Sequence, residues 1–444
     1  MTIRNSKNAP TLPESYWAAT AILGLDFSSL KGTKKADVCV IGGGFAGLST
    51  ALHLASAGVS TVLVEAAEPG WGASGRNGGQ IIPGFKAERS ELVQRVGEEK
   101  AERLFSWSGT FVDTTLDLIK KHDIDCQASQ PGWIQPAHSF RALSDFQRRI
   151  EEWQSRGADV SILGQGETAE LLGTNWYKGA VLDRRGGRLH PLSYARGLAR
   201  AAGAAGVSIY GNSAVRKISR AHSNWEVDTD KGTVVADKVI FCTNAYSSAF
   251  GSIWPKLATS VVPVLSYMVA TRPLSADLRE TILRDGHTAA DLKRLTNHFR
   301  VEPDGRFLFG GRGGLAEGDD RANSSHVVAK LHELFPQLKD VPLEFFWSGK
   351  VALTMDHLPH LHELSPGVWS SLGCNGRGVG MCSAMGPIVA RLITGGDPRD
   401  CPVPVTTLRA IPFHGMRLPA MQAAVWWKGM QDKFDHSALE GQSP

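Results

Sequence analysis

A glycine-rich turn close to the N-terminus constrains the fold of this chain more than any other feature. An apolar strand is expected over 37–41, and it ends at the run Gly42-Gly43-Gly44-Phe45-Ala46-Gly47. A helix is expected over 48–57 and a second strand over 61–64. A strand, a G-x-G-x-x-G turn and a helix in this order form the unit that binds the pyrophosphate of a dinucleotide. We therefore expect an α/β domain of Rossmann type.

Each position of the turn has a physical purpose. Gly42 permits the tight turn, Gly44 lets the backbone approach a pyrophosphate, and Gly47 lets the helix pack close to the strand. The helix N-terminus adds open amides and the positive end of a dipole. Glu65 follows the second strand, where its carboxylate can accept hydrogen bonds from ribose hydroxyls. The flanking strand, helix and acid weigh against the alternative, a glycine turn without a ligand.

A second glycine cluster, Gly310-Gly311-Arg312-Gly313-Gly314, also follows an expected strand. No apolar helix opens after it, so we interpret it as a turn at the end of a strand. The chain thus shows one dinucleotide unit. This weighs against enzymes that bind both FAD and NAD(P)H through two such units.

Length and charge narrow the class of protein further. A chain of 444 residues is typical of two or three domains, and 48 basic against 44 acidic side chains give no basis for nucleic-acid binding. No run of about 18 apolar residues exists, so no membrane span is expected. The segment 1–13 lacks the apolar core of a signal peptide. Six scattered cysteines without a Cys-x-x-Cys pair favour a reduced, cytoplasmic protein. The oligomeric state is not predicted.

The loop Gly70-Trp71-Gly72-Ala73-Ser74-Gly75-Arg76-Asn77-Gly78-Gly79-Gln80 is more specific than the turn. It resembles the corresponding loop of gamma-glutamylputrescine oxidases, a branch of the D-amino-acid oxidase-like, or glycine/sarcosine oxidase-like, FAD-dependent superfamily. Further blocks at 179–192, 335–349 and 373–379 resemble the same family. Together these blocks extend over about residues 36–440.

The resemblance implies a discontinuous Rossmann-like FAD-binding domain, interleaved with a mixed, antiparallel-rich α+β substrate domain. On this basis we expect an N-terminal arm over 1–34 and a C-terminal helical tail over 401–444. The FAD domain would comprise 35–110, 191–250 and 346–400. The substrate domain would comprise 111–190 and 251–345.

The resemblance also implies which residues hold FAD. The turn and the second strand would bind the ADP part, the 72–80 loop would wrap the ribityl chain and flavin ring, and a C-terminal glycine loop would face the flavin pyrimidine. The expected set is Gly42, Gly44, Phe45, Ala46, Gly47, Glu65, Ala66, Gly72, Ala73, Ser74, Arg76, Asn77, Gly78, Gly79, Gln80, Val215, Asn244, Ala245, Gly349, Gly373, Gly376, Arg377, Gly378, Val379 and Gly380.

Two departures from the family pattern concern this C-terminal loop. Arg377 stands where the family often has His, and Cys374 where an aromatic residue is common. A permanent cation at 377 can bind the flavin O2 region or a substrate carboxylate. The stretch 350–354 lacks the cysteine through which some sarcosine oxidase relatives attach flavin, so noncovalent FAD is expected.

The family chemistry is oxidation of a C–N bond. An amine would transfer hydride to flavin N5, the imine would hydrolyse, and oxygen would reoxidise the flavin to give hydrogen peroxide. The expected substrate is a small secondary amine or a gamma-glutamylated amine. Two alternatives remain open: a dehydrogenase of an amino or imino acid that passes electrons to a quinone or carrier, and a nonenzymatic flavin-binding protein.

Three cations are the candidate catalytic residues: Lys350, Arg312 and Arg377. For Lys350 the alternative is a surface lysine, and for Arg312 a solvated turn residue. His190, before Pro191, is interpreted as structural.

No metal is expected at Asp356, His357, His360 and His362, because their spacing does not fit a helical H-E-x-x-H site and Pro359 breaks the local helix. Trp426 and Trp427 in the tail predict an amphipathic helix that packs on the body or makes a membrane-surface or dimer contact.

Overall fold

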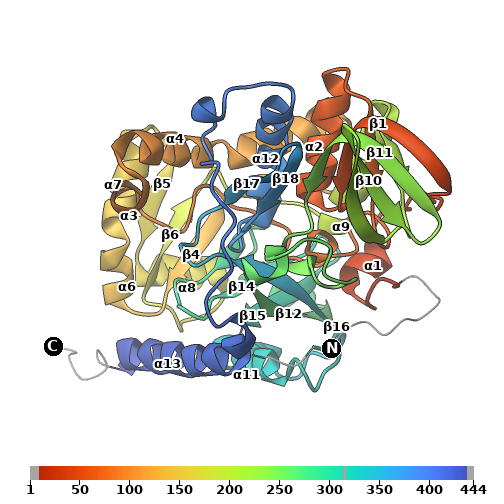
Figure 1. Ribbon diagram of the computed structural model, residues 1–444. Helices are drawn as coiled ribbons and strands as arrows, with labels where there is room; N and C mark the ends of the chain where they lie inside the picture. Colours follow the sequence, from red (N-terminus) through yellow and green to blue (C-terminus); the bar gives the residue numbers. More distant parts are fainter. Residues whose placement is uncertain (1–9, 313, 315–316, 438–444) are drawn as a thin grey trace.

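The chain folds around two large β-sheets, and the computed structural model describes residues 10–312, 314 and 317–437 (Figure 1). The first sheet has a parallel centre in the order β8-β2-β1-β11-β18, with β17 antiparallel at the edge. A hairpin of β9 and β10 extends from β11. The bounds are β1 (Gly32–Ile41), β2 (Thr61–Val64), β8 (Ser208–Tyr210), β9 (Val215–Ala221), β10 (Asn224–Thr229), β11 (Gly232–Phe241), β17 (His360–Ser365) and β18 (Val368–Leu372).

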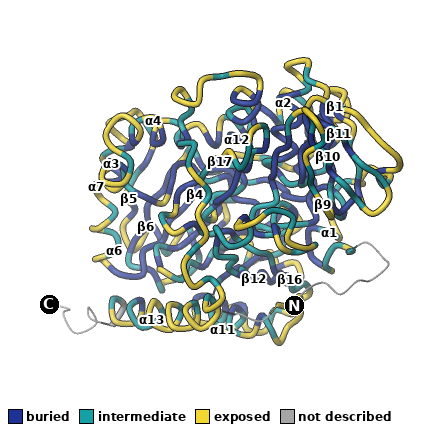
Figure 2. Tube along the Cα trace, in the orientation of Figure 1, coloured by how far each residue is buried: buried dark blue, intermediate teal, exposed yellow. Residues whose placement is uncertain are grey.

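The apolar end of β1 explains why this sheet is parallel and central. Val38, Cys39, Val40 and Ile41 are all buried, so the strand is covered on both faces, as parallel strands require. Three helices provide cover: α2 (Phe45–Ser56), α9 (Pro191–Ala204) and α12 (Gly378–Ile393). Figure 2 shows the interior strands as buried and the outer helices as partly exposed.

The second sheet is mostly antiparallel, in the order β16-β12-β15-β14-β13-β4-β6-β5, with one parallel pair between β13 and β4. Phe299, Phe307, Phe309 and Phe335 are buried together on one face, against α11 (Ser325–Leu334). The strand bounds are β4 (Trp133–Ala137), β5 (Val160–Leu163), β6 (Gly179–Asp183), β12 (Val262–Pro273), β13 (Thr288–Ala290), β14 (Asn297–Val301), β15 (Arg306–Arg312) and β16 (Leu343–Leu353). The two sheets together match the expected α/β domain interleaved with an antiparallel-rich domain.

The remaining elements are mostly helices at the periphery. A short sheet of β3 (Gln80–Ile81) and β7 (Gly187–Arg188) lies apart from the two large ones. The helices are α3 (Arg89–Val96), α4 (Glu98–Gly109), α5 (Phe111–Lys121), α6 (Phe140–Asp145), α7 (Gln147–Ser155), α8 (Gln165–Leu172) and α10 (Ala276–Thr281). None of the helices in the described ranges is both long and apolar enough to cross a lipid bilayer.

One domain boundary and the packing of the N-terminal arm differ from what the sequence predicts. Strand β16 pairs with β12 along its length, so residues 346–353 belong to the second sheet, whereas 346–400 was expected to form the third segment of the FAD domain. The N-terminal arm also packs into the body of the protein. Its helix α1 (Tyr16–Thr20) places Trp17 in a core cluster with Trp347, and the Trp17 indole donates to the Asn77 carbonyl at 2.9 Å. The pairing of β16 with β12 places residues 346–353, and the burial of Trp17 places the arm. The composition of the sequence reveals neither.

The tail forms α13 (Arg417–Ser437), as expected, and a buried carboxylate holds it to the body. Asp432 accepts hydrogen bonds from the backbone amides of Arg294 and Leu295 and from the Arg294 guanidinium, at 3.1–3.2 Å. Trp426 and Trp427 are 64% and 56% exposed. The ends of the arm and tail, 1–9 and 438–444, lie outside the described residues, as does Gly313.

The close packing of α2 on α12 leads to a stability prediction. A Cβ on Gly386 would lie 2.0 Å from Ser49 Oγ and 2.6 Å from the Ser49 carbonyl carbon, so Gly386→Ala forces the two helices apart. We expect a loss of about 1–3 kcal/mol, the usual cost of overpacking, seen as a lower midpoint in thermal unfolding. Gly203→Ala in α9 is the matched control, because nothing lies within 4 Å of its Cβ position. An unchanged midpoint for Gly386→Ala would contradict the packing argument.

Candidate active site

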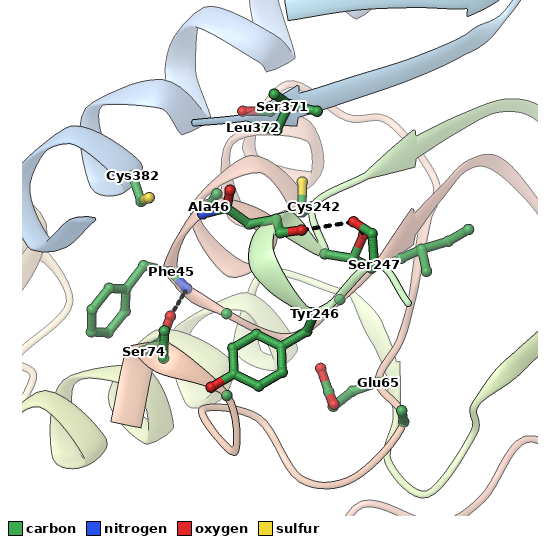
Figure 3. Close-up of a pocket in the computed structure, with 18 of the residues that line it drawn as sticks. Phe45, Ala46, Glu65, Ser74, Cys242, Tyr246, Ser247, Ser371, Leu372 and Cys382 are labelled. Carbon is green, nitrogen blue, oxygen red and sulfur yellow. Dashed lines mark hydrogen bonds between the residues drawn. The ribbon is translucent and has the colours of Figure 1, made fainter. Parts of the chain in front are cut away.

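A cavity opens at the carboxyl ends of the parallel strands of the first sheet, where α/β folds of this kind bind ligands. It holds about 1050 Å³ of space not filled by atoms, including the part open to solvent. The β1–α2 turn, the end of β2, the loop at 71–74, the end of β11 and the start of α12 all contribute to its walls (Figure 3). Expected cofactor residues that line it are Gly42, Gly44, Phe45, Ala46, Glu65, Ala66, Gly72, Ala73, Ser74, Val215 and Asn244.

Glycine is required in the turn because neighbouring backbone atoms lie too close to leave room for a side chain. Gly42 has φ of +109°, and a Cβ on Gly47 would lie 1.9 Å from the Gly42 carbonyl oxygen. Gly44 caps α2 without a side chain, and the next amide, of Phe45, donates to Ser74 Oγ at 3.0 Å. The loop at 73–75 is thereby tied to the helix N-terminus, as the dashed line in Figure 3 shows. Gly47 serves the packing of the helix rather than the cavity wall.

Glu65 holds the turn from the opposite side. Its Oε2 accepts from the Gly43 amide at 2.6 Å, and its Oε1 accepts from the Ala67 amide at 3.0 Å. Burial raises the pKa of Glu65, and the bonds from the backbone amides act against this rise. Each carboxylate oxygen can accept a further bond, so the carboxylate both shapes the turn and remains available to a ribose hydroxyl on the cavity side.

Within the 72–80 loop, two of the expected residues act on the loop itself. Arg76 donates to the Trp71 carbonyl at 2.8 Å and to the Ser348 carbonyl at 3.2 Å, and it stacks on the Trp71 ring. Asn77 donates to the Ala73 and Ser74 carbonyls and accepts from the Gly79 amide. Both side chains therefore hold the backbone of the loop in place. The sequence predicts that the same two residues contact the flavin directly.

The last three residues of that loop lie against the second sheet. A Cβ on Gly78 would lie 2.9 Å from His298 Nδ1, and the Gly79 carbonyl accepts from Arg300 at 2.8 Å. Gln80 Nε2 donates to the Ala289 carbonyl at 2.8 Å, whereas its buried Oε1 has no partner among the described residues. This edge is where the two sheets meet.

Two glycines with positive φ angles shape the C-terminal glycine loop. Gly373 has φ of +88° and donates its amide to Asn244 Oδ1 at 3.0 Å, and Gly376 has φ of +85°. Arg377 is the N-cap of α12, which has no side-chain cap. Val379 is buried behind Gly378, and a Cβ on Gly380 would lie 2.8 Å from Phe111 Cβ, so Gly380 serves helix packing.

Two further expected residues lie outside the cavity wall. Gly349 lies against Arg76, and Ala245 is buried in a 3₁₀ turn at 244–246.

The three candidate catalytic cations occupy different surroundings. Lys350 Nζ pairs with Glu317 at 2.9 Å, and its backbone amide donates to the Tyr246 hydroxyl at 3.1 Å. Arg312 Nη2 lies 2.8 Å from the Cβ position of Gly376, so its guanidinium reaches the C-terminal loop. Arg377 lies over the Trp133 ring at 4.8 Å. The structure thus brings Arg312 to the loop that Arg377 terminates, while Lys350 is beside Tyr246.

Sequence reasoning missed several residues at this site. Tyr246 and Cys242 line the cavity next to expected residues, and Met381 and Cys382 do so on α12. His298 lies half-buried on β14 beside Gly78 and Gly310, and burial and the charge of Arg312 lower its pKa to about 4. No local pattern marks His298, because its neighbours Gly78 and Gly310 come from distant segments.

The histidines noted in the sequence have structural partners. His190 caps α9, where its Nδ1 accepts from the Ser193 amide at 3.1 Å, and burial lowers its pKa to about 3. His360 pairs with Asp356 at 3.0 Å and stacks on His362. Over the described ranges, no group of three or more His, Cys, Asp or Glu side chains is arranged to hold a metal ion.

Comparison with known proteins identifies the family. The model of the DAO family, described as FAD dependent oxidoreductase, matches residues 37–392. The chain belongs to this family. The gamma-glutamylputrescine oxidoreductase of Escherichia coli is 33% identical over 425 residues, which cover 95% of this chain and 98% of that protein. A probable oxidoreductase, OrdL, of Haemophilus influenzae is 33% identical over 87% of this chain and 89% of that protein.

Solved structures agree with the fold. The glycine oxidase of Geobacillus kaustophilus superposes with a TM-score of 0.68 at 23% identity, covering 82% of this chain and 95% of that one. The L-proline dehydrogenase of P. horikoshii gives 0.68 at 21% identity, covering 84% and 96%. The resemblance and the fold class are confirmed. The protein is an FAD-dependent oxidoreductase, and the cradle at Gly44, which a Cβ would fill to within 2.9 Å of Ser74 Oγ, fits the close approach of its pyrophosphate.

The two hydrogen bonds of Glu65 predict the effect of removing its charge. Glu65→Gln keeps one acceptor and turns the other position into a donor that faces a backbone amide. We expect the Kd for FAD, measured by titrating apoprotein and following flavin fluorescence, to rise about tenfold or more. Glu68→Gln is the control, because Glu68 pairs with Arg196 at 3.0 Å. Equal FAD affinity for wild type and Glu65→Gln would show that the carboxylate has no role in binding.

Proposed function

We propose that this enzyme oxidises the C–N bond of a small amine that carries a carboxylate, such as a secondary amino acid or a gamma-glutamylated amine. The observation that carries the proposal is the position of Arg312, whose guanidinium reaches the C-terminal glycine loop without an ion-pair partner among the described residues. Guanidinium groups bind carboxylates in a bidentate manner. The similarity to the gamma-glutamylputrescine oxidoreductase of Escherichia coli supports an amine as substrate.

Bound FAD would supply the redox chemistry, accepting hydride at N5 from the carbon next to nitrogen. The residues of this chain would bind and orient the substrate. The neutral His298, next to Gly78, offers a polar group beside the flavin loop without a competing positive charge. We assign the FAD contacts to the residues that line the cavity, with noncovalent binding, and we assign Arg76, Asn77, Gly47 and Gly380 to support of the backbone.

Lys350 is a weaker candidate than Arg312 in this scheme. Its ammonium is paired with Glu317, and the two side chains are 26% and 49% exposed. Contact with Tyr246, which lines the cavity, supports a role in positioning that ring. We propose oxygen as the electron acceptor, with hydrogen peroxide as product, and a cytoplasmic location on the basis of six free cysteines.

Anaerobic reduction tests this function directly. Purified enzyme with bound FAD is mixed without oxygen with primary, secondary and gamma-glutamylated amines, with and without a carboxylate, and the visible flavin band is followed. We expect a carboxylated amine to bleach the band, and readmitted air to restore it with formation of peroxide. Restoration only by a quinone or dye would assign a dehydrogenase instead. A bound flavin that no amine bleaches would refute an amine substrate.

Arg312→Gln extends the test to the residue. It should raise KM for the carboxylated amine about tenfold or more, because one charged hydrogen-bond partner is removed. An uncarboxylated amine gives the comparison, since its KM should change little. Equal changes for the two substrates would contradict carboxylate binding at Arg312.

A further inference from the structure

Four cationic side chains converge beside the C-terminal glycine loop, and we call them the cationic recess: Lys86, Arg149, Arg312 and Arg377. Arg149 of α7 donates to the Phe85 and Lys86 carbonyls, which brings it to the segment after the 72–80 loop. Arg312 comes from β15 and Arg377 from the start of α12. Four separate segments therefore deliver positive charge to one place.

The recess is crowded by protein yet accessible. Burial lowers the pKa of Arg312, and it lowers that of Arg377 well below the ordinary value, although both side chains keep part of their surface accessible. Burial and the charges of Arg312 and Arg377 lower the pKa of Lys86 to about 8, although Lys86 remains exposed. Arg312 and Arg377 are thus half-buried cations that solvent still reaches.

Negative charge does not balance these cations within the protein. Asp183 is the acid that most favours the charged form of Arg377, but its carboxylate is held by Arg185 at 2.7 and 2.9 Å. In the parts of the chain that the structure describes, Lys86, Arg312 and Arg377 form no ion pair. Desolvated cations without partners are costly, so the arrangement is complete only when anionic groups enter.

A second observation marks where such a group would bind. Trp133 is 3% exposed, and its Nε1–H has no acceptor among the described residues. The Arg377 guanidinium lies over the same indole ring, at 4.8 Å from its centroid. A buried donor next to a buried cation is suited to one carboxylate, separate from the place where Arg312 meets Gly376.

We propose that the cationic recess selects substrates with two anionic groups, such as N-carboxyalkyl amino acids. Arg312 holds the carboxylate at the glycine loop, and Arg377, with Lys86 and the Trp133 indole, holds the second. This rests on the proposed function, and it narrows the substrate class. A gamma-glutamylated amine that carries one carboxylate and an ammonium would leave the recess with excess positive charge.

Arg377 gives the second subsite a guanidinium, which can bind a carboxylate through two N–H groups. Lys428 of α13 extends the positive field outward, because its charge contributes to the lowered pKa of both Lys86 and His357. This positive field would attract an anionic substrate toward the recess.

The test measures binding of anions that cannot be oxidised. FAD-loaded enzyme is titrated by calorimetry with glutarate and with valerate, which have the same chain length and two or one carboxylates. We expect glutarate to bind about tenfold or more tightly than valerate, because the second charged contact is made only by the diacid. In Arg377→Gln and in Lys86→Met this ratio should fall to within about threefold. Arg184→Gln, which removes an exposed cation paired with Asp159, is the control and should keep the ratio.

The pH dependence gives a second readout. Lys86 is protonated below its pKa of about 8, so glutarate affinity should decrease as pH rises through that value. The charged groups that face Lys86 are Arg149, Arg312, Arg377 and Lys428. Lys86→Met should bind more weakly and show a flatter profile between about pH 7 and 9.

The outcomes separate this proposal from the proposed function. Equal affinities for the two acids in the wild type, or a ratio retained in both Arg377→Gln and Lys86→Met, would overturn the second subsite. Turnover is compared on N-methylglycine and N-(carboxymethyl)glycine, which differ by one carboxylate. Oxidation of both with equal kcat/KM would refute two-anion selection and leave the amine oxidase intact. Tight glutarate binding without oxidation of any amine would refute the function and leave the recess as an anion site.

Discussion

The structure depends on how closely α2 approaches its neighbours. The helix starts at the glycine turn, where Gly47 touches the Gly42 carbonyl, and its other side packs on α12 at the contact of Ser49 with Gly386. The Ser49 hydroxyl donates to the Ser383 carbonyl at 2.8 Å across this interface. Because Arg377 is the N-cap of α12, the contact that sets the dinucleotide turn also sets the C-terminal glycine loop. One tightly packed pair of helices thus positions two segments more than 300 residues apart in the sequence.

The site lies where the two sheets join, and backbone carbonyls and amides do much of the joining. Arg76 reaches the carbonyl of Ser348 in the second sheet, and Arg300 reaches the carbonyl of Gly79 in the 72–80 loop. Trp17 of the arm donates to the carbonyl of Asn77. These bonds hold a glycine-rich loop, which has few side chains of its own, in a single conformation. Rigid support of this kind is what close positioning of a cofactor and a substrate requires.

Much of the fold was predictable because it depends on local patterns. The apolar run that ends at Ile41, the glycines after it and the acid at Glu65 are adjacent in sequence, and each has a direct backbone role. The ranges of residues in the second sheet were less predictable, because β16 joins it through pairing with β12 rather than through any signal of its own. The contact of Arg76 and Asn77 with the flavin stays a prediction, and the hydrogen bonds of their side chains to backbone carbonyls are a feature that a loop motif alone does not reveal.

The sequence by itself determined the dinucleotide unit, since this depends on a short run of glycines and on the acid that follows them. The resemblance of the 70–80 loop indicated the family and with it FAD, and the family model confirms it. Only the tertiary structure decided which cations share a site. Arg312 and Arg377 lie on different elements, and Lys86 and Trp133 carried no mark in the sequence. Charge repulsion, burial and unpaired donors arise from contacts between distant segments, so they become visible only when the two sheets are assembled.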